Sequence, residues 1–77
     1  MRERRYTILL HPDPNGEGYT VTVPALPGCV TQGDTVEEAI AMAKDAVTLY
    51  IESLVAEGRP VPEEKAPPQA LTISVAA

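Results

Sequence analysis

The chain has 77 residues, 44% of them hydrophobic and 22% charged, which suits one small globular domain over residues 1–77 and leaves no room for a second. The net charge of −5 disfavours phosphate backbones as direct partners, so we expect no specific DNA binding. The negative charge has two possible explanations: it favours binding to a basic protein partner, or it only keeps a small domain soluble. The single cysteine, Cys29, excludes an internal disulfide framework and a cysteine-based zinc site. No apolar run approaches the ~20 residues that span a bilayer and no signal sequence opens the chain, so we expect a cytoplasmic protein away from membranes.

Three short stretches in the first half of the chain have the alternating or β-branched pattern of strands. They are residues 4–11, residues 19–24 and residues 29–32. The segments between them, 12–18 and 25–28, are rich in proline and glycine, which favour turns and interrupt a sheet ladder. Strands joined by such short turns are expected to form an antiparallel meander.

The strongest helical pattern spans about residues 35–57. Asp34 or Thr35 can cap its start, and Thr35 with Glu38 fits a capping box, in which the glutamate accepts from the cap amide. Gly58 supplies the stop. One stripe of apolar side chains recurs at helical spacing and is expected to face the core: Val36, Ala39, Ile40, Ala43, Val47, Tyr50, Ile51 and Leu54.

The last third of the chain is predicted to contain a connection and a fourth strand. Residues 59–69 hold four prolines and suit an extended connection. In residues 70–76, Leu71, Ile73 and Val75 alternate with polar neighbours, which predicts a strand beside the first one. The element order predicts an α+β fold, β-β-β-α-β, with one long helix on one face of the sheet. The opposite face is expected to be half-polar and rich in threonine.

Few residues have the chemistry of an active site. His11 is the only histidine, and a general base needs an orienting partner. Asp13 is near in sequence but suits a turn-forming role better, so we expect His11 to be a surface or interface residue. Cys29 has no base to activate it and is expected to be a small buried hydrophobe. Asp34, Glu37 and Glu38 cluster at the helix start, where acids complement the helix dipole without a metal. We therefore predict no catalytic, cofactor-binding or metal-binding residues.

A second, narrower apolar stripe lies beside the core stripe of the predicted helix. Met42, Ala46 and Leu49 form it, and they either lie under the proline-rich connection or mark an oligomer contact. Leu9 offers a comparable apolar position on the open face of the sheet. Because a core of fewer than ~80 residues is small, we expect a homo-oligomer, with a dimer as the first choice.

The segment from Pro24 to Ala39 has a distinctive order of features. It contains a Leu-Pro-Gly-Cys turn, a short strand, Gly-Asp-Thr and a helix that begins Glu-Glu-Ala. This run, with the preceding strand from Gly18 to Val23, resembles the signature of HicB-like antitoxin domains. The resemblance covers nearly the whole chain from Tyr6 onward and implies a partial RNase H-like β-β-β-α-β fold.

The same resemblance implies a function. HicB antitoxins neutralise HicA, a small toxin that resembles double-stranded-RNA-binding domains and cleaves mRNA. We therefore expect this chain to bind and neutralise a HicA-like basic toxin by protein–protein contact, without enzymatic activity or a cofactor. Many HicB antitoxins carry a C-terminal DNA-binding domain, which has no counterpart in this pattern. The alternatives are an orphan regulatory or ligand-binding domain without a toxin, and a nuclease, which would need converging carboxylates.

Overall fold

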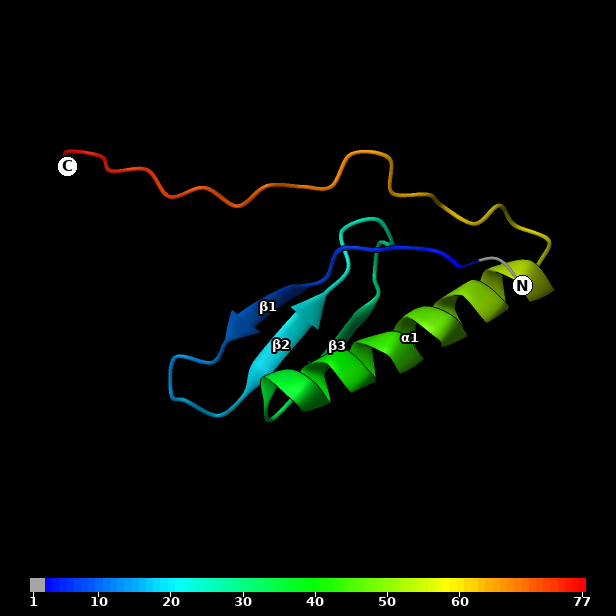
Figure 1. Ribbon diagram of the computed structural model, residues 1–77, viewed down its shortest axis with the longest axis horizontal. Coiled ribbons are helices and arrows are strands. Elements are labelled where there is room, and N and C mark those ends of the chain that lie inside the picture. The colour runs from blue at the N-terminus through cyan, green and yellow to red at the C-terminus, as the bar shows by residue number, and fades with distance from the viewer. Residues whose placement is uncertain (1–2) are drawn as a thin grey trace.

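The computed structural model describes residues 3–77, and its centre is an antiparallel sheet with a helix on one face (Figure 1). The strands are β1 (Leu9–Pro12), β2 (Tyr19–Thr22) and β3 (Val30–Gly33), and they lie in the order β1-β2-β3. The helix α1 (Val36–Ala56) follows β3. This arrangement confirms the predicted α+β class, the meander and the long helix.

The register of the sheet places the predicted core positions on the helix side. Leu10 lies opposite Val21, which in turn lies opposite Thr31. The first turn is closed by a hydrogen bond of 2.9 Å, which the Asp13 amide donates to the Gly18 carbonyl directly beyond the paired ends of β1 and β2. The proline- and glycine-rich segments therefore form the turns between strands, as the sequence predicts.

β1 begins later than the sequence predicts, at Leu9 instead of residue 4. If the register of β1 and β2 continued, Thr7 would lie opposite Pro24. Pro24 has no amide hydrogen to donate and β2 ends at Thr22, so the ladder stops and residues 4–8 remain outside it. The bounds of β2 and β3 differ from the predicted ones by no more than two residues.

The helix begins and ends within one residue of its predicted bounds. Thr35 is its N-cap, and the Thr35 hydroxyl accepts a hydrogen bond of 3.1 Å from the Glu38 amide. The Glu38 carboxylate accepts from the Asp34 amide at 2.8 Å, one residue before the cap amide that a capping box predicts. After the helix, Gly58 has a φ of 69°, a left-handed conformation that glycine adopts without steric cost. Among residues 3–77, no helix is long and apolar enough to cross a membrane.

The core lies between the sheet and α1 and consists of two adjoining clusters. Their buried side chains are Val21, Ala39 and Ala43 in the first, and Val23, Leu26 and Cys29 in the second. The half-buried Ile8 packs against both clusters. Because α1 packs mainly against β3 and less against β2, part of its apolar stripe is left uncovered. Val36 and Ile40 are 42% and 40% exposed, although the sequence predicts them in the core.

The predicted fourth strand is not confirmed. Residues 70–76 are extended and run away from the sheet, and they pair with no strand among the described residues (Figure 1). Leu71, Ile73 and Val75 are 82%, 80% and 79% exposed. The Cα radius of gyration is 14.6 Å, whereas a compact chain of this length has about 11.5 Å. The difference reflects a C-terminal segment that projects from the folded body.

Candidate functional site

His11 and Cys29, the candidates for basic and nucleophilic chemistry, lie in different environments. His11 is exposed, and its Nε2 lies 2.9 Å from the Thr22 hydroxyl. Cys29 is buried in the second core cluster, and this burial raises the pKa of its thiol above the ordinary value. A raised pKa leaves less thiolate near neutral pH and so lowers nucleophilicity. Cys29 is therefore the small buried hydrophobe that the sequence predicts, and His11 lies at the surface.

Acidic side chains gather where the first turn meets the start of α1. A shallow depression of about 340 Å³ is lined there by Asp13, Glu17 and Asp34, together with His11 and Gln32. Among residues 3–77, no group of three histidine, cysteine or acidic side chains is placed to hold a metal ion. We call Asp13, Glu17 and Asp34 the acidic edge. It is an anionic surface that suits a cationic partner.

The face of the sheet opposite α1 is open and half-polar. Leu9, Thr22 and Val30 lie side by side in one row across the three strands. His11, Thr20 and Gln32 form the next row, and this row adjoins the acidic edge in the same depression. The sequence predicts the threonines and Leu9 on this face. It does not predict Val30, which lies on the same face and is 59% exposed. Protein-binding surfaces commonly combine such apolar and polar side chains.

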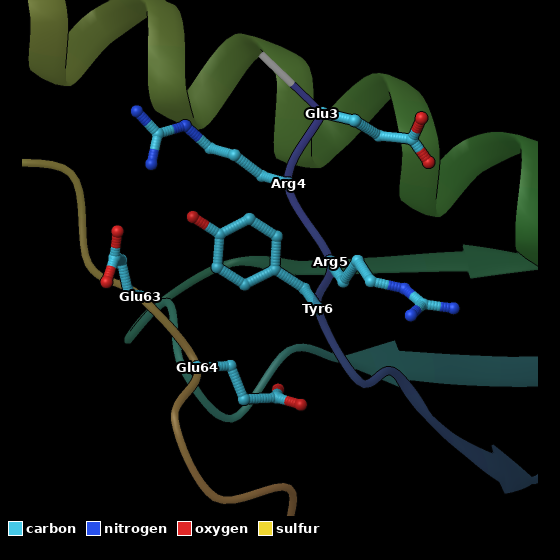
Figure 2. A pocket seen from close by; sticks show the side chains of 6 residues that line it. All are labelled: Glu3, Arg4, Arg5, Tyr6, Glu63 and Glu64. Carbon is cyan, nitrogen blue, oxygen red and sulfur yellow. The ribbon is translucent and has the colours of Figure 1, made fainter.

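A set of hydrogen bonds ties the N-terminal segment to the connection after α1. The Tyr6 hydroxyl donates to the Pro62 carbonyl at 2.6 Å. The amide and the hydroxyl of Thr7 donate to the two oxygens of Glu64, at 2.8 and 2.6 Å. We call these four residues the clasp. Figure 2 shows the side chains that line a cavity of about 180 Å³ beside it, with Tyr6 on the N-terminal segment and Glu63 and Glu64 on the connection after α1.

The clasp was missed by sequence reasoning because no local pattern links its halves. Thr7 and Glu64 are separated by 57 positions, and Glu64 lies in a stretch that reads only as a proline-rich connection. The nearest available signal is Pro24, which has no amide hydrogen to donate to the Thr7 carbonyl and so stops the ladder there. The Thr7 amide then lies outside the ladder and needs an acceptor elsewhere.

A groove of about 570 Å³ lies between the N-terminal segment and α1. Its apolar lining includes Ile8 from the N-terminal segment and Ile40, Ala43 and Val47 from the helix. Cationic side chains, Arg4, Arg5 and Lys44, also line it. This groove is the place where the apolar stripe of α1 extends beyond the sheet.

Comparison with known proteins places the chain in a family. The family described as HicB-like antitoxin of bacterial toxin-antitoxin system matches residues 6–72, which contain all three strands and the helix. The chain belongs to the HicB-like antitoxin family. The function implied for HicB-like proteins is therefore a regulatory one in a toxin–antitoxin system.

HicB-like relatives differ in length around the shared region. A UPF0150 protein of Synechocystis is 54% identical over 59 residues, which cover 77% of this chain and 73% of that protein. The antitoxin HicB 1 of Photorhabdus laumondii is 39% identical over 62 residues, which cover 80% of this chain but 39% of the relative. For the antitoxin HicB of Escherichia coli K12 the identity is 49%, over 56% of this chain and 30% of the relative. The chain thus spans less than half of these two named antitoxins.

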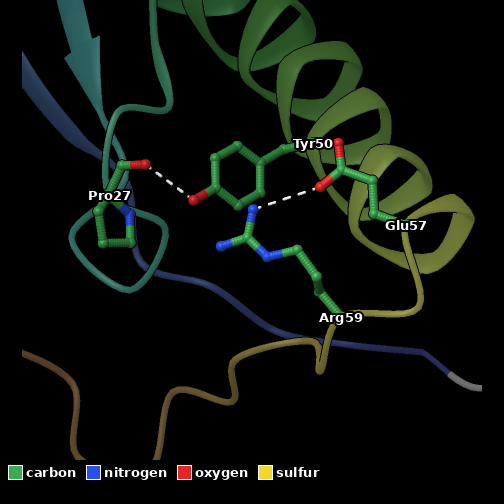
Figure 3. Close-up of polar contacts among 4 residues, drawn as sticks. All are labelled: Pro27, Tyr50, Glu57 and Arg59. Atoms are coloured by element: carbon green, nitrogen blue, oxygen red, sulfur yellow. Dashed lines mark hydrogen bonds and ion pairs between the residues drawn. The ribbon is translucent and has the colours of Figure 1, made fainter.

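The HicB-like signature has a structural role in this chain. Its Leu-Pro-Gly-Cys turn places Leu26 in the core, where it is 1% exposed. Gly28 takes a φ of 83°, and the Cys29 amide donates to the Leu26 carbonyl at 3.0 Å. The Tyr50 hydroxyl of α1 donates to the Pro27 carbonyl at 2.8 Å, which ties the turn to the helix (Figure 3). These contacts hold the turn in place against the helix.

Proposed function

We propose that this HicB-like chain binds and neutralises a HicA-type toxin and has no enzymatic activity of its own. The observation that carries the proposal is the match of the antitoxin family to residues 6–72. Neutralisation by contact needs a surface that a basic RNA-binding protein recognises. A cluster of carboxylates meets that need, because it competes with phosphate for the same cationic side chains.

The open sheet face and the acidic edge together form the contact surface in this proposal. They adjoin one another through His11 and Gln32, so one partner can cover both. Val30 and Leu9 supply apolar area, and the acidic edge supplies charge complementarity and orientation.

Co-expression tests this proposal. The chain is produced together with a HicA-type toxin, and growth and co-purification are measured. We expect restored growth and a stable complex with the wild-type chain. The double variant Glu17→Lys/Asp34→Lys should bind the toxin at least about tenfold more weakly, because it reverses charge at the contact.

The matched control is Asp45→Lys/Glu52→Lys, which changes net charge by the same amount at exposed positions of α1. It should neutralise the toxin as the wild type does. Equal loss of binding in both variants would remove the acidic edge from the proposal. RNA cleavage by the purified chain that is lost in Asp34→Asn would contradict the non-enzymatic role.

We also propose that the chain acts in the cytoplasm and binds no specific DNA by itself. The net charge of −5 supports the absence of specific DNA binding, because carboxylates repel a phosphate backbone. A gel-shift titration against the promoter region of its own gene is the test. A sequence-selective shift below micromolar concentration at physiological salt would contradict it.

A second candidate function is that of an orphan regulatory or ligand-binding domain without a toxin. The groove of about 570 Å³ beside α1 favours it, because an apolar lining with cationic side chains suits an amphipathic ligand. A neighbouring gene for a short basic protein favours the antitoxin, and its absence favours the orphan domain.

The proposed assembly is a homodimer, in which residues 1–77 form one domain with a completed β-β-β-α-β, partial RNase H-like fold. Among residues 3–77, seven hydrophobic side chains are buried, and a second copy adds apolar area to so small a core.

A further inference from the structure

The C-terminal segment has the composition of a strand but not the environment of one. Three apolar residues, Leu71, Ile73 and Val75, alternate along the sequence with the polar Thr72 and Ser74. The three apolar side chains are about four-fifths exposed. An alternating β-branched row of this kind is stable when one face is covered and the backbone is paired. A single copy provides this segment with neither.

The outer edge of β1 offers the missing backbone partners. The bond from the Asp13 amide to the Gly18 carbonyl continues the ladder of β1 and β2. Since antiparallel bonding alternates along a strand, the backbone groups of Leu9 and His11 face β2, and those of Ile8 and Leu10 face outward. An edge with free amides and carbonyls is a template for a further strand.

The groove beside α1 lies next to this same edge. Its apolar lining comes from Ile8, Ile40, Ala43 and Val47, and Ile40 is 40% exposed. A strand added at the β1 edge directs every second side chain toward the helix. Three apolar side chains at alternate positions, as in residues 71–75, are what such a strand needs to cover the helix stripe.

The segment does not reach this site on its own chain. The clasp fixes Glu64 next to Thr7, and the chain then continues through Pro67 and Pro68. Two consecutive prolines hold the backbone extended at about 3.1 Å per residue. The segment leaves the body on a stiff connection and diverges from β1 (Figure 1).

We propose that two copies of this chain exchange their C-terminal segments. Residues 70–76 of each copy pair with the open edge of β1 in the other copy, and Leu71, Ile73 and Val75 fill its groove. Two such contacts are equivalent under a twofold axis, so the assembly closes as a dimer. This inference rests on the homodimer proposed above and is independent of toxin binding.

Light scattering on the purified full chain tests the exchange. The wild type should have twice the 8.2 kDa mass of one chain. Ile73→Glu should reduce this mass to that of a single chain, because it places a carboxylate in the apolar groove. Ser74→Glu is the matched control on the other face of the segment and should remain dimeric. An unchanged helical circular dichroism signal shows that each variant is folded.

The groove is tested separately with two helix positions of equal exposure. Ile40 lies in the groove and is 40% exposed, whereas Met42 lies outside its lining and is 42% exposed. Ile40→Glu should dissociate the dimer, and Met42→Glu should not. Mixing Ile73→Glu with Ile40→Glu should restore a heterodimer, because one intact segment still meets one intact groove.

Two results would overturn the exchange. A monomeric wild type at tens of micromolar removes both the homodimer and the exchanged segment. A dimer that survives Ile73→Glu but dissociates in Leu9→Glu or Met42→Glu keeps the homodimer and places its contact on the open sheet face or the helix flank. A monomeric wild type leaves toxin neutralisation untouched, because co-expression measures it independently. A dimer contact on the open sheet face would instead compete with the toxin surface proposed above.

Discussion

Gly33 is the position where the end of β3 approaches the start of α1 most closely. A Cβ atom there would lie 2.5 Å from the Ala39 amide nitrogen and 2.7 Å from its Cα. Gly33→Ala must therefore move backbone, and we expect it to lower the free energy of unfolding by about 2 kcal/mol. Gly16→Ala is the control, since Gly16 has a φ of 76° but open space around it, and should cost about 1 kcal/mol. Urea denaturation measures both, and equal costs would contradict the close approach.

The burial of Cys29 predicts that the free energy of unfolding depends on pH. Its burial raises the thiol pKa in the folded chain above the ordinary value of 9.0. The unfolded chain then releases the thiol proton first, so the stability contributed by Cys29 is complete below pH 9 and is lost as pH rises through the folded pKa. We expect the stability difference between the wild type and Cys29→Ala to narrow above pH 9. A difference independent of pH between 7 and 10.5 would contradict this.

At the scale of elements, the clasp joins the N-terminal segment to the connection after α1. Glu64→Ala removes both acceptors of Thr7, and we expect a loss of about 2 kcal/mol. Thr7→Val retains the amide donor and should cost about 1 kcal/mol. In a double-mutant cycle the two changes should couple by about 1 kcal/mol, measured by denaturation. Strict additivity would show that the hydroxyl bond contributes nothing to stability.

The elements also show which parts of this fold a sequence reveals. The helix start was predictable because Thr35 and Glu38 are three positions apart and satisfy local amides. The start of β1 was not predictable, because it depends on Pro24, which would lie opposite Thr7 if the pairing of β1 and β2 continued. The periodicity of α1 identified the apolar stripe, but the exposure of Ile40 depends on where the helix crosses the sheet. The acidic edge likewise joins a turn to a helix start, and only the fold brings them together.

At the scale of the whole molecule, the balance between a small core and an exposed segment decides the assembly. Each exchanged segment would remove three large apolar side chains from water, each worth about 1.5–3 kcal/mol. Two segments together contribute roughly 9–18 kcal/mol as an upper value. Association costs about 4–15 kcal/mol. The two terms are of the same order, so the dimer should dissociate into single chains on dilution.

Thermal stability should therefore depend on protein concentration. Because a dimer is stabilised by mass action, a tenfold rise in concentration adds about 1.4 kcal/mol per dimer. For a dimer of this size, that should raise the midpoint of thermal unfolding by about 4 °C. Circular dichroism melts between 2 and 200 µM, a hundredfold range, should show about twice this shift for the wild type and for Ser74→Glu, but none for Ile73→Glu. A wild-type midpoint that is constant over this range would mean that the unfolding chain is not a dimer, which would contradict the exchange of C-terminal segments.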